Sequence, residues 1–296
     1  MSVLLLDGPV GTMLNRMGIA TPPPGWSAGA IASSPAAIRE IHRAYAQAGA
    51  CVHTANTFRT QPRHFPQEWR SLLRQAVGLA RQGCLPGQVV AGSMAPLLDC
   101  YSPWLSPPEP GPEHAQVAQA LAEEGVDLLL VETFPHIGEA LSAVEQALAT
   151  GLPTWLALTP GPEGDLLGPA EVARAAVQAA EMGVEAVLVN CLPARRALEW
   201  LLPLREAVPE LPVGVYANAG HPREGLGWEA DPSLAGAAYA ELARQWVEAG
   251  ARIVGSCCGT GPETITATRT LLGRQLSPDV AGWRAGRRRP AGPAGS

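Results

Sequence analysis

The stretch WVEAGARIVGSCCGTGPE, residues 246–263, contains a complete passage from a helix through a strand into a loop. A helical segment ends next to Gly250, an apolar run follows at residues 252–256, and Gly259, Gly261 and Pro262 then interrupt the strand. Glycine just beyond a helix is a common C-terminal cap, and a short, almost wholly apolar run is typical of a parallel strand covered on both faces. The stretch therefore predicts one repeating unit of a parallel α/β fold.

The same pattern recurs along the whole chain. Strand-like apolar runs occupy residues 3–6, 50–54, 88–92, 127–132, 154–159, 186–190, 213–217 and 252–256. Segments with helical periodicity occupy residues 36–48, 68–81, 113–124, 137–149, 171–182, 194–207, 232–249 and 262–273. Eight strand–helix units in this order favour a TIM (β/α)8 barrel over an open doubly wound sheet.

Length and composition indicate one domain. The chain has 296 residues, of which 47% are apolar, and single α/β barrels of about 250 residues are routine. We expect the barrel to span residues 1–275. Residues 276–296 are rich in Pro, Gly, Ala and Arg, a composition that predicts a disordered C-terminal tail.

Charge and hydropathy narrow the range of partners. The net charge is −6 and only 16% of residues are charged, which argues against nucleic acid or an anionic membrane and favours a small-molecule partner. The basic run 287–289 lies in the expected tail and is interpreted as a solvated end. The N-terminus lacks the features of a signal peptide, and no apolar run reaches the ~18 to 20 residues of a membrane span. We therefore expect a cytoplasmic protein, in which clustered cysteines bind metals or catalyse more often than they form disulfides.

Three of the six cysteines follow predicted strands. Cys191 ends the sixth strand, and Cys257 and Cys258 end the eighth. These strands have the same parity in a barrel, so their inward side chains share a layer, and functional groups gather at the strand ends. Adjacent cysteines on a regular strand point to opposite faces, so both reach one metal only if the strand has already broken. Gly259 and Gly261 permit that break.

A zinc ion (Zn2+) held by three thiolates, with the fourth tetrahedral position open, defines a catalytic site. Coordination to the metal would deprotonate a substrate thiol whose pKa is ordinarily near ~8.5. Two inert thiols or a strained vicinal disulfide are the alternatives for Cys257 and Cys258. The other cysteines, Cys51, Cys84 and Cys100, are interpreted as small apolar core residues.

Polar side chains at other strand ends are candidates for binding the substrate. Asp7 and Gly8 follow the first strand, and a carboxylate beside glycine amides could hold a substrate ammonium and carboxylate. Glu132 closes a buried strand, where a carboxylate is costly unless it is paired or functional, and it would grip an amino group. Thr57 after the second strand and Asn190 at the sixth add neutral polar groups.

Two features remain open on the residues alone. Residues 95–112 are rich in Pro and contain Tyr101 and Trp104, so they form either a wall over the barrel mouth or a plain surface loop. The histidines show no metal-ligand spacing. His136 and His221 follow strand ends, but neither is assigned to the site.

At these positions the sequence resembles the homocysteine S-methyltransferase family over nearly its whole length. The most specific match is Gly255 to Glu263 together with Asn190 and Cys191. Further matches are Asp7-Gly8, residues 91–93, Glu132-Thr133 and residues 216–220. The sequence departs from the family pattern at Ser256, Ala217 and Ala55. The resemblance implies a barrel that binds zinc through Cys191, Cys257 and Cys258 and contacts homocysteine through Asp7 and Glu132.

The sequence therefore predicts zinc-dependent transfer of a methyl group to the thiol of homocysteine, giving methionine. The methyl donor stays open between S-methylmethionine, a similar small compound and a methylcorrinoid protein acting in trans. Two other functions remain as alternatives: methylation of a different thiol, and a zinc-binding subunit that works only with a corrinoid partner protein. The oligomeric state is not predicted.

Overall fold

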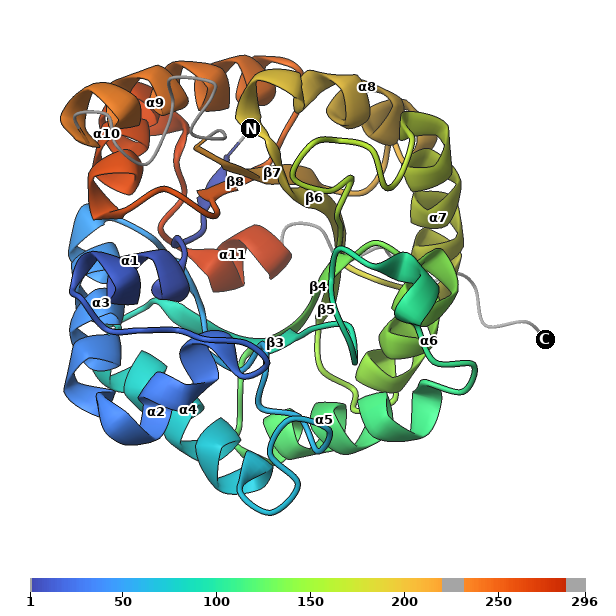
Figure 1. Ribbon diagram of the computed structural model, residues 1–296. Helices are drawn as coiled ribbons and strands as arrows, with labels where there is room; N and C mark the ends of the chain where they lie inside the picture. Colours follow the sequence, from blue (N-terminus) through green and yellow to red (C-terminus); the bar gives the residue numbers. More distant parts are fainter. Residues whose placement is uncertain (1, 220–231, 286–296) are drawn as a thin grey trace.

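The computed structural model describes residues 2–219 and 232–285, and its eight parallel strands form a closed barrel (Figure 1). The strands are β1 Leu4–Leu5, β2 Val52–Thr54, β3 Val89–Met94, β4 Leu128–Phe134, β5 Thr154–Leu158, β6 Ala186–Pro193, β7 Val213–Asn218 and β8 Ile253–Ser256. From β2 to β8 each strand pairs with the next in sequence, and β1 pairs with β8. The barrel closes where Leu6 bridges Val52 and the Cys51 amide donates to the Leu5 carbonyl at 2.8 Å. The predicted TIM barrel is confirmed.

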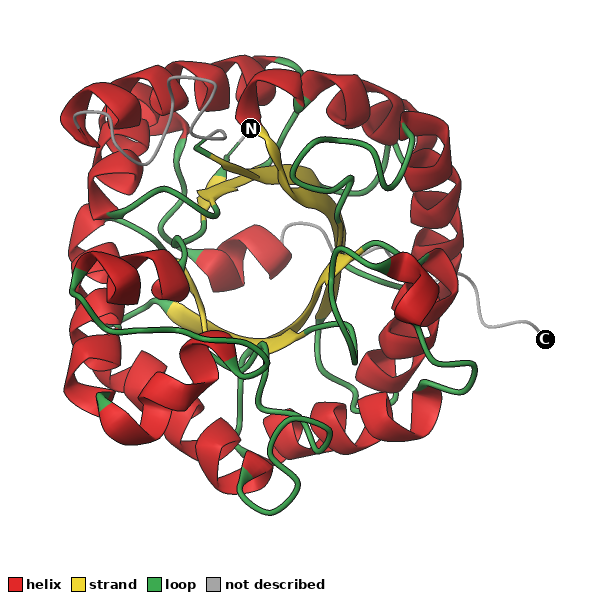
Figure 2. Cartoon of the chain, in the orientation of Figure 1, coloured by secondary structure: helices red, strands yellow, loops and turns green. Residues whose placement is uncertain are grey.

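Helices form a ring outside the strands (Figure 2). The helices are α1 Val10–Arg16, α2 Gly29–Ser33, α3 Pro35–Ala48, α4 Trp69–Gly83, α5 Gly111–Glu123, α6 Ile137–Leu148, α7 Pro169–Met182, α8 Leu198–Ala207, α9 Pro232–Glu248, α10 Pro262–Leu272 and α11 Val280–Ala285, of which α11 is not part of the ring. Gly49 and Gly183 end α3 and α7 with φ of 113° and 107°, a left-handed conformation that favours glycine. The short helices α1 and α2 were not predicted, because periodicity is weak over so few residues.

The core has two layers. One lies between the helices and the outer face of the barrel, and the other fills the barrel with side chains such as Leu4, Leu130, Trp155 and Ile253. A filled interior leaves the carboxyl ends of the strands as the place where loops shape a site.

The prediction of a disordered tail from residue 276 is wrong for its first part. Leu276 bridges Val3, and α11 follows at Val280–Ala285, with Val280 buried in the interior cluster. Figure 1 shows α11 beneath the centre of the ring. Composition failed here because the segment is anchored by the burial of Val280 in the interior cluster, a tertiary contact that composition does not reveal. The basic run 287–289 lies outside the described residues.

Among the helices in the described ranges, none combines the length and the apolar character that crossing a membrane requires.

Candidate active site and metal centre

The three predicted cysteines meet at the mouth of the barrel. The Sγ atoms of Cys191 and Cys257 are 2.8 Å apart, those of Cys257 and Cys258 are 4.0 Å apart, and all three lie within 4.8 Å of one another. The strand does break after β8, as the glycines predict: Gly259 has φ of 82° and its amide donates to Thr12 Oγ1 at 3.1 Å. Both adjacent cysteines can therefore turn toward Cys191.

Two strand ends depart from regular geometry beside this cluster. Cys191 has φ of 51° and Thr133 has φ of 63°, and the register shifts in β6 and β4 at these positions. Asn190 Nδ2 donates to Thr133 Oγ1 at 2.7 Å and so ties the two bulges together. Left-handed backbone at residues other than glycine is strained and concentrates at functional sites. Here it turns the Cys191 thiol away from the sheet and into the barrel mouth.

The pKa shifts of the clustered cysteines show that a bound cation would stabilise their thiolates. Hydrogen bonds with Cys191 and Cys258, together with burial, raise the pKa of Cys257, whereas hydrogen bonds from Cys191 and Cys257 lower the pKa of Cys258. Negative charge is thus favoured on Cys258 over Cys257. Three thiolates become stable together only when a divalent ion compensates their charge.

The donor set fits zinc. Tetrahedral zinc with Zn–S bonds of about 2.3 Å places its sulfur ligands about 3.8 Å apart. The sulfur separations of this cluster, from 2.8 to at most 4.8 Å, bracket that value. Cys191, Cys257 and Cys258 would hold the ion and leave one position for a substrate.

Asp7 lies beside the adjacent cysteines Cys257 and Cys258, because β1 pairs with β8 and the Ser256 amide donates to the Asp7 carbonyl at 3.2 Å. Its Oδ2 accepts a hydrogen bond from the Thr54 amide at 3.0 Å, and burial raises its pKa well above the usual range. The neighbouring Gly8 has no room for a side chain, because a Cβ there would lie 2.7 Å from Ser256 Oγ and 2.8 Å from Tyr45 Oη. Glycine at this position therefore lets the backbone beside Asp7 pack closely against Ser256 and Tyr45.

Glu132 is held from both sides. Ser93 Oγ donates to Oε1 at 2.5 Å and Tyr216 Oη donates to Oε2 at 2.8 Å. Burial raises the pKa of Glu132, and these hydrogen bonds oppose the increase. The carboxylate is fixed in orientation, and each oxygen keeps a lone pair for a further donor.

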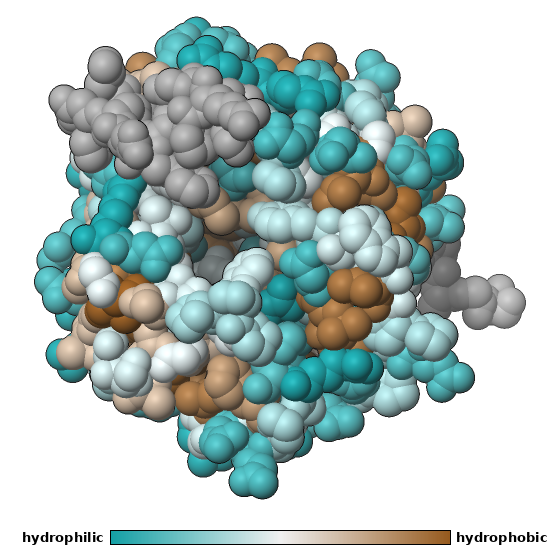
Figure 3. Space-filling model, viewed as in Figure 1, coloured by the Kyte–Doolittle hydropathy of each residue, from teal (hydrophilic) through white to brown (hydrophobic). Residues whose placement is uncertain are grey.

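One cavity of about 590 Å³ connects these groups. The space-filling view shows a hollow near the middle of this face (Figure 3). The cavity is lined by the three cysteines, Asp7, Gly8, Glu132 and an aromatic group of Trp26, Phe58 and Tyr101. Six of the predicted residues therefore face one space: the three cysteines, the two carboxylates and the glycine beside Asp7.

Thr57 and Asn190 were expected to touch the substrate, but neither lines this cavity in the described structure. Thr57 Oγ1 donates to the Ser93 carbonyl at 2.9 Å and accepts from the Ser93 amide at 3.0 Å, while Asn190 binds Thr133. Their polar groups brace the strand ends from behind, since loop backbone next to them needs partners. His136 caps α6 through its Nδ1, and His221 is outside the described residues.

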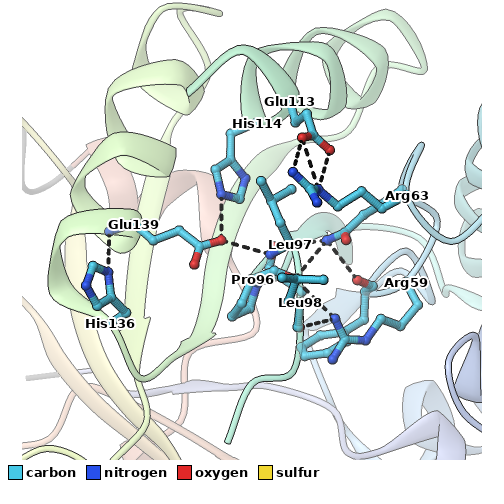
Figure 4. A network of polar contacts seen from close by, with 12 residues as sticks. Arg59, Arg63, Pro96, Leu97, Leu98, Glu113, His114, His136 and Glu139 are labelled. Atoms are coloured by element: carbon cyan, nitrogen blue, oxygen red, sulfur yellow. Dashed lines mark hydrogen bonds and ion pairs between the residues drawn. The ribbon is translucent and has the colours of Figure 1, made fainter. Parts of the chain in front are cut away.

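Residues 95–112 form part of the cavity wall, since Cys100 and Tyr101 line it. Figure 4 shows how this loop is anchored: Arg59 donates to the carbonyls of Pro96 and Leu98 at 3.1 and 2.6 Å. Glu139 accepts from the Leu97 amide at 2.8 Å and pairs with His114 at 3.2 Å. The alternative of a plain surface loop is thereby excluded.

Sequence reasoning missed several wall residues. Trp26 lies in an irregular segment with no periodicity, and Phe58 lies beside Thr57 without a polar group to mark it. Ser93 and Tyr216 stand at strand ends and could have been found by the same rule that selected Glu132.

The fold and the site define a class: a barrel in which three convergent cysteine thiols, able to hold a metal ion, line one pocket with two buried carboxylates. The family model for homocysteine S-methyltransferase matches residues 4–272. The chain belongs to the homocysteine S-methyltransferase family and is a methyltransferase.

Individual relatives agree with this assignment. The chain is 30% identical to homocysteine S-methyltransferase of Escherichia coli over 90% of this chain and 94% of the relative. It is 28% identical to homocysteine S-methyltransferase 3 of Zea mays over 91% and 90% of the two chains. It is 26% identical to a selenocysteine methyltransferase of Astragalus bisulcatus over 93% and 94%.

Solved structures show the same likeness. The homocysteine methyltransferase MmuM of Escherichia coli, in its metallated form, superimposes with a TM-score of 0.71 and 25% identity, covering 91% of this chain and 96% of that one. The oxidised form of the same protein gives a TM-score of 0.72.

Proposed function

We propose that this protein transfers a methyl group to the thiol of homocysteine, giving methionine, with zinc held by Cys191, Cys257 and Cys258. One observation carries the proposal: three convergent thiols and two buried carboxylates line a single cavity. A bound zinc ion supplies Lewis acidity, which keeps a coordinated substrate thiol deprotonated at neutral pH.

The protein's own side chains select and orient the acceptor. Asp7 and Glu132 offer two carboxylates to one ammonium group in a buried setting, where such pairing is strong. Burial raises the pKa of both acids and so disfavours their charge, a cost that a substrate cation would relieve. A thiol without an ammonium group would leave this charge uncompensated.

We further propose a small cationic methyl donor such as S-methylmethionine. Cavities of this size, about 590 Å³, hold small molecules. The ring of Tyr101 lines the cavity and would attract an onium methyl group, whereas the rings of Trp26 and Phe58 already carry the Arg59 guanidinium at 4.8 and 5.0 Å. The protein would hold donor methyl and acceptor sulfur in line, with water excluded by the anchored loop 95–112. This favours a small donor over a methylcorrinoid protein.

The test compares metal content and turnover in cysteine variants. Cys191→Ala and Cys258→Ala should lose zinc by mass spectrometry and lose homocysteine methylation with S-methylmethionine by at least ~100-fold. Cys84→Ala serves as the matched control, because this thiol is half-buried and does not line the cavity. Full activity of metal-free protein would refute the proposal.

A further inference from the structure

Two buried histidines lie behind Asp7. His42 on α3 and His53 on β2 have no exposed surface, and neither lines the cavity. The Nδ1 atom of each ring is 3.9 Å from Asp7 Oδ2, and the two rings meet edge to face with centroids 6.4 Å apart. Asp7 is thus the link between the cavity and a buried polar cluster.

The protonation of His53 is fixed by Gln88. His53 Nε2 is 3.0 Å from Gln88 Oε1, which also accepts from the Leu85 amide at 2.7 Å. Gln88 Nε2 donates to the Ala50 carbonyl at 2.7 Å, so the orientation of the amide group is determined by its partners. His53 must therefore carry its proton on Nε2, and its Nδ1 presents a lone pair toward Asp7.

The cluster consequently has too few donors. His53 Nδ1 and Asp7 Oδ2 are both acceptors, and among the described residues His53 Nδ1 and both nitrogens of His42 have no hydrogen-bond partner. Burial lowers the pKa of His42 to about 3 and of His53 to about 4, so the rings are neutral and form no ion pair with Asp7. Buried polar groups of this kind are paired in folded proteins, so a small group must bridge the three side chains.

The distances distinguish a cation from a water molecule. A metal bound at about 2.0 to 2.2 Å holds neighbouring ligand atoms about 3.0 to 3.5 Å apart, whereas a water bonded at about 2.8 Å holds them about 4.0 to 4.6 Å apart. The two distances of 3.9 Å to Asp7 Oδ2 lie between these ranges and much closer to the one for a water, which they therefore favour.

We propose that His42 and His53 are positioning residues for Asp7, acting through one buried water that donates to His53 Nδ1 and to Asp7 Oδ2 and accepts from His42 Nδ1–H. The bridge fixes the carboxylate so that its cavity side meets the ammonium group of the acceptor. This inference rests on homocysteine as the acceptor. It makes His42 and His53 determinants of amino-acid specificity, although neither touches the substrate.

The first test uses a pair of thiols as its internal control. His53→Phe keeps a planar ring but removes the acceptor, and we expect KM for homocysteine to rise about tenfold, the effect of one lost hydrogen bond to a charged group. The KM for deaminohomocysteine, which keeps the thiol and carboxylate but lacks the amino group, should stay unchanged, as should zinc content. His53→Asn restores an acceptor near the position of Nδ1 and should recover most of the homocysteine affinity.

His64→Phe is the matched control variant, because His64 faces Arg59 rather than Asp7, and it should leave the ratio of the two KM values unaltered. Equal losses for both thiols in His53→Phe, or no change for homocysteine, would overturn the inference.

A second measurement uses the wild-type protein and therefore does not depend on whether a variant folds. In a high-resolution crystal structure of the zinc-loaded protein, one water should lie about 2.8 Å from Asp7 Oδ2, His42 Nδ1 and His53 Nδ1. Anomalous scattering from a metal at this point, or direct contact among the three side chains, would contradict the water bridge. If the wild-type protein methylated neither thiol, the proposed function itself would fail instead.

Discussion

Single residues at strand ends carry the chemistry of this protein, and Glu132 shows the conflict between function and stability most clearly. Its carboxyl is buried, its pKa is raised by burial, and among the described residues it is bound by the hydroxyl groups of Ser93 and Tyr216. A charge in such a place destabilises the empty protein and becomes favourable when a substrate cation arrives. Function and folding therefore make opposite demands on this residue.

Glu132→Gln should separate the two demands. Loss of a buried charge partner costs roughly 2 to 5 kcal/mol, so kcat/KM for homocysteine should fall about 30-fold or more. The variant should methylate deaminohomocysteine with the same kcat/KM as the wild type. Glu199→Gln, which alters an exposed ion pair with Arg196, provides the control. A similar loss with both thiols would show that Glu132 acts on something other than the amino group.

In the Glu132→Gln variant, the melting temperature should depend on pH differently from that of the wild type. The folded pKa of Glu132 is raised, so the unfolded carboxyl ionises first as pH increases, and the penalty for burying the charge begins above the unfolded value near ~4.3. Below that pH both states are protonated and the penalty is absent. Glu132→Gln should therefore match the wild type in Tm in acid and exceed it at neutral pH. An equal difference at all pH values would contradict this origin.

Among the elements, loop 95–112 depends most on contacts with distant parts of the chain. Glu139 near the start of α6 accepts from the Leu97 amide and from His114 on α5, so one side chain joins the loop to two helices. Although burial disfavours its charge, these hydrogen bonds lower its pKa overall. Tyr101 in the same loop is placed against the cavity by this anchor.

Glu139→Ala should lower the free energy of unfolding by about 2 to 4 kcal/mol, because two buried donors lose their acceptor. Glu145→Ala, an exposed position on the same helix, should change it little. Because the folded pKa of Glu139 is depressed, its contribution is present above the unfolded value near ~4.3 and lost as pH falls through the folded value. Denaturant titrations at neutral pH and in acid measure this, and a pH-independent difference would contradict it.

At the scale of the whole molecule, the barrel is filled by side chains and closed below by α11. Val280 packs into the interior cluster together with Leu4 of β1 and Ile253 of β8. Val280→Ala should destabilise the protein by roughly 1 to 3 kcal/mol, as removal of buried methyl groups does. Val177→Ala, on the exposed side of α7, should have almost no effect. Equal unfolding free energies in the two variants would show that α11 is not part of the core.

Local patterns were enough to predict the architecture. Each strand is a short apolar run and several helices end at glycine, and neither property depends on distant residues, so all eight strands were located. The cysteine cluster was also predictable, because strand parity and the glycines after β8 restrict where Cys191, Cys257 and Cys258 can point. The donor set, and with it the expected metal, was available from the sequence for the same reason.

Tertiary structure decided everything that depends on which distant segments pack together. The bridge between Leu6 and Val52 closes the barrel, Trp26 reaches the cavity from an irregular segment, and α11 enters the core through one valine. Thr57 and Asn190 turned to backbone and side-chain partners instead of the cavity, and His42 and His53 met behind Asp7. The physical reason is that the direction of a side chain follows from local backbone, whereas its partner is set by the packing of the whole barrel.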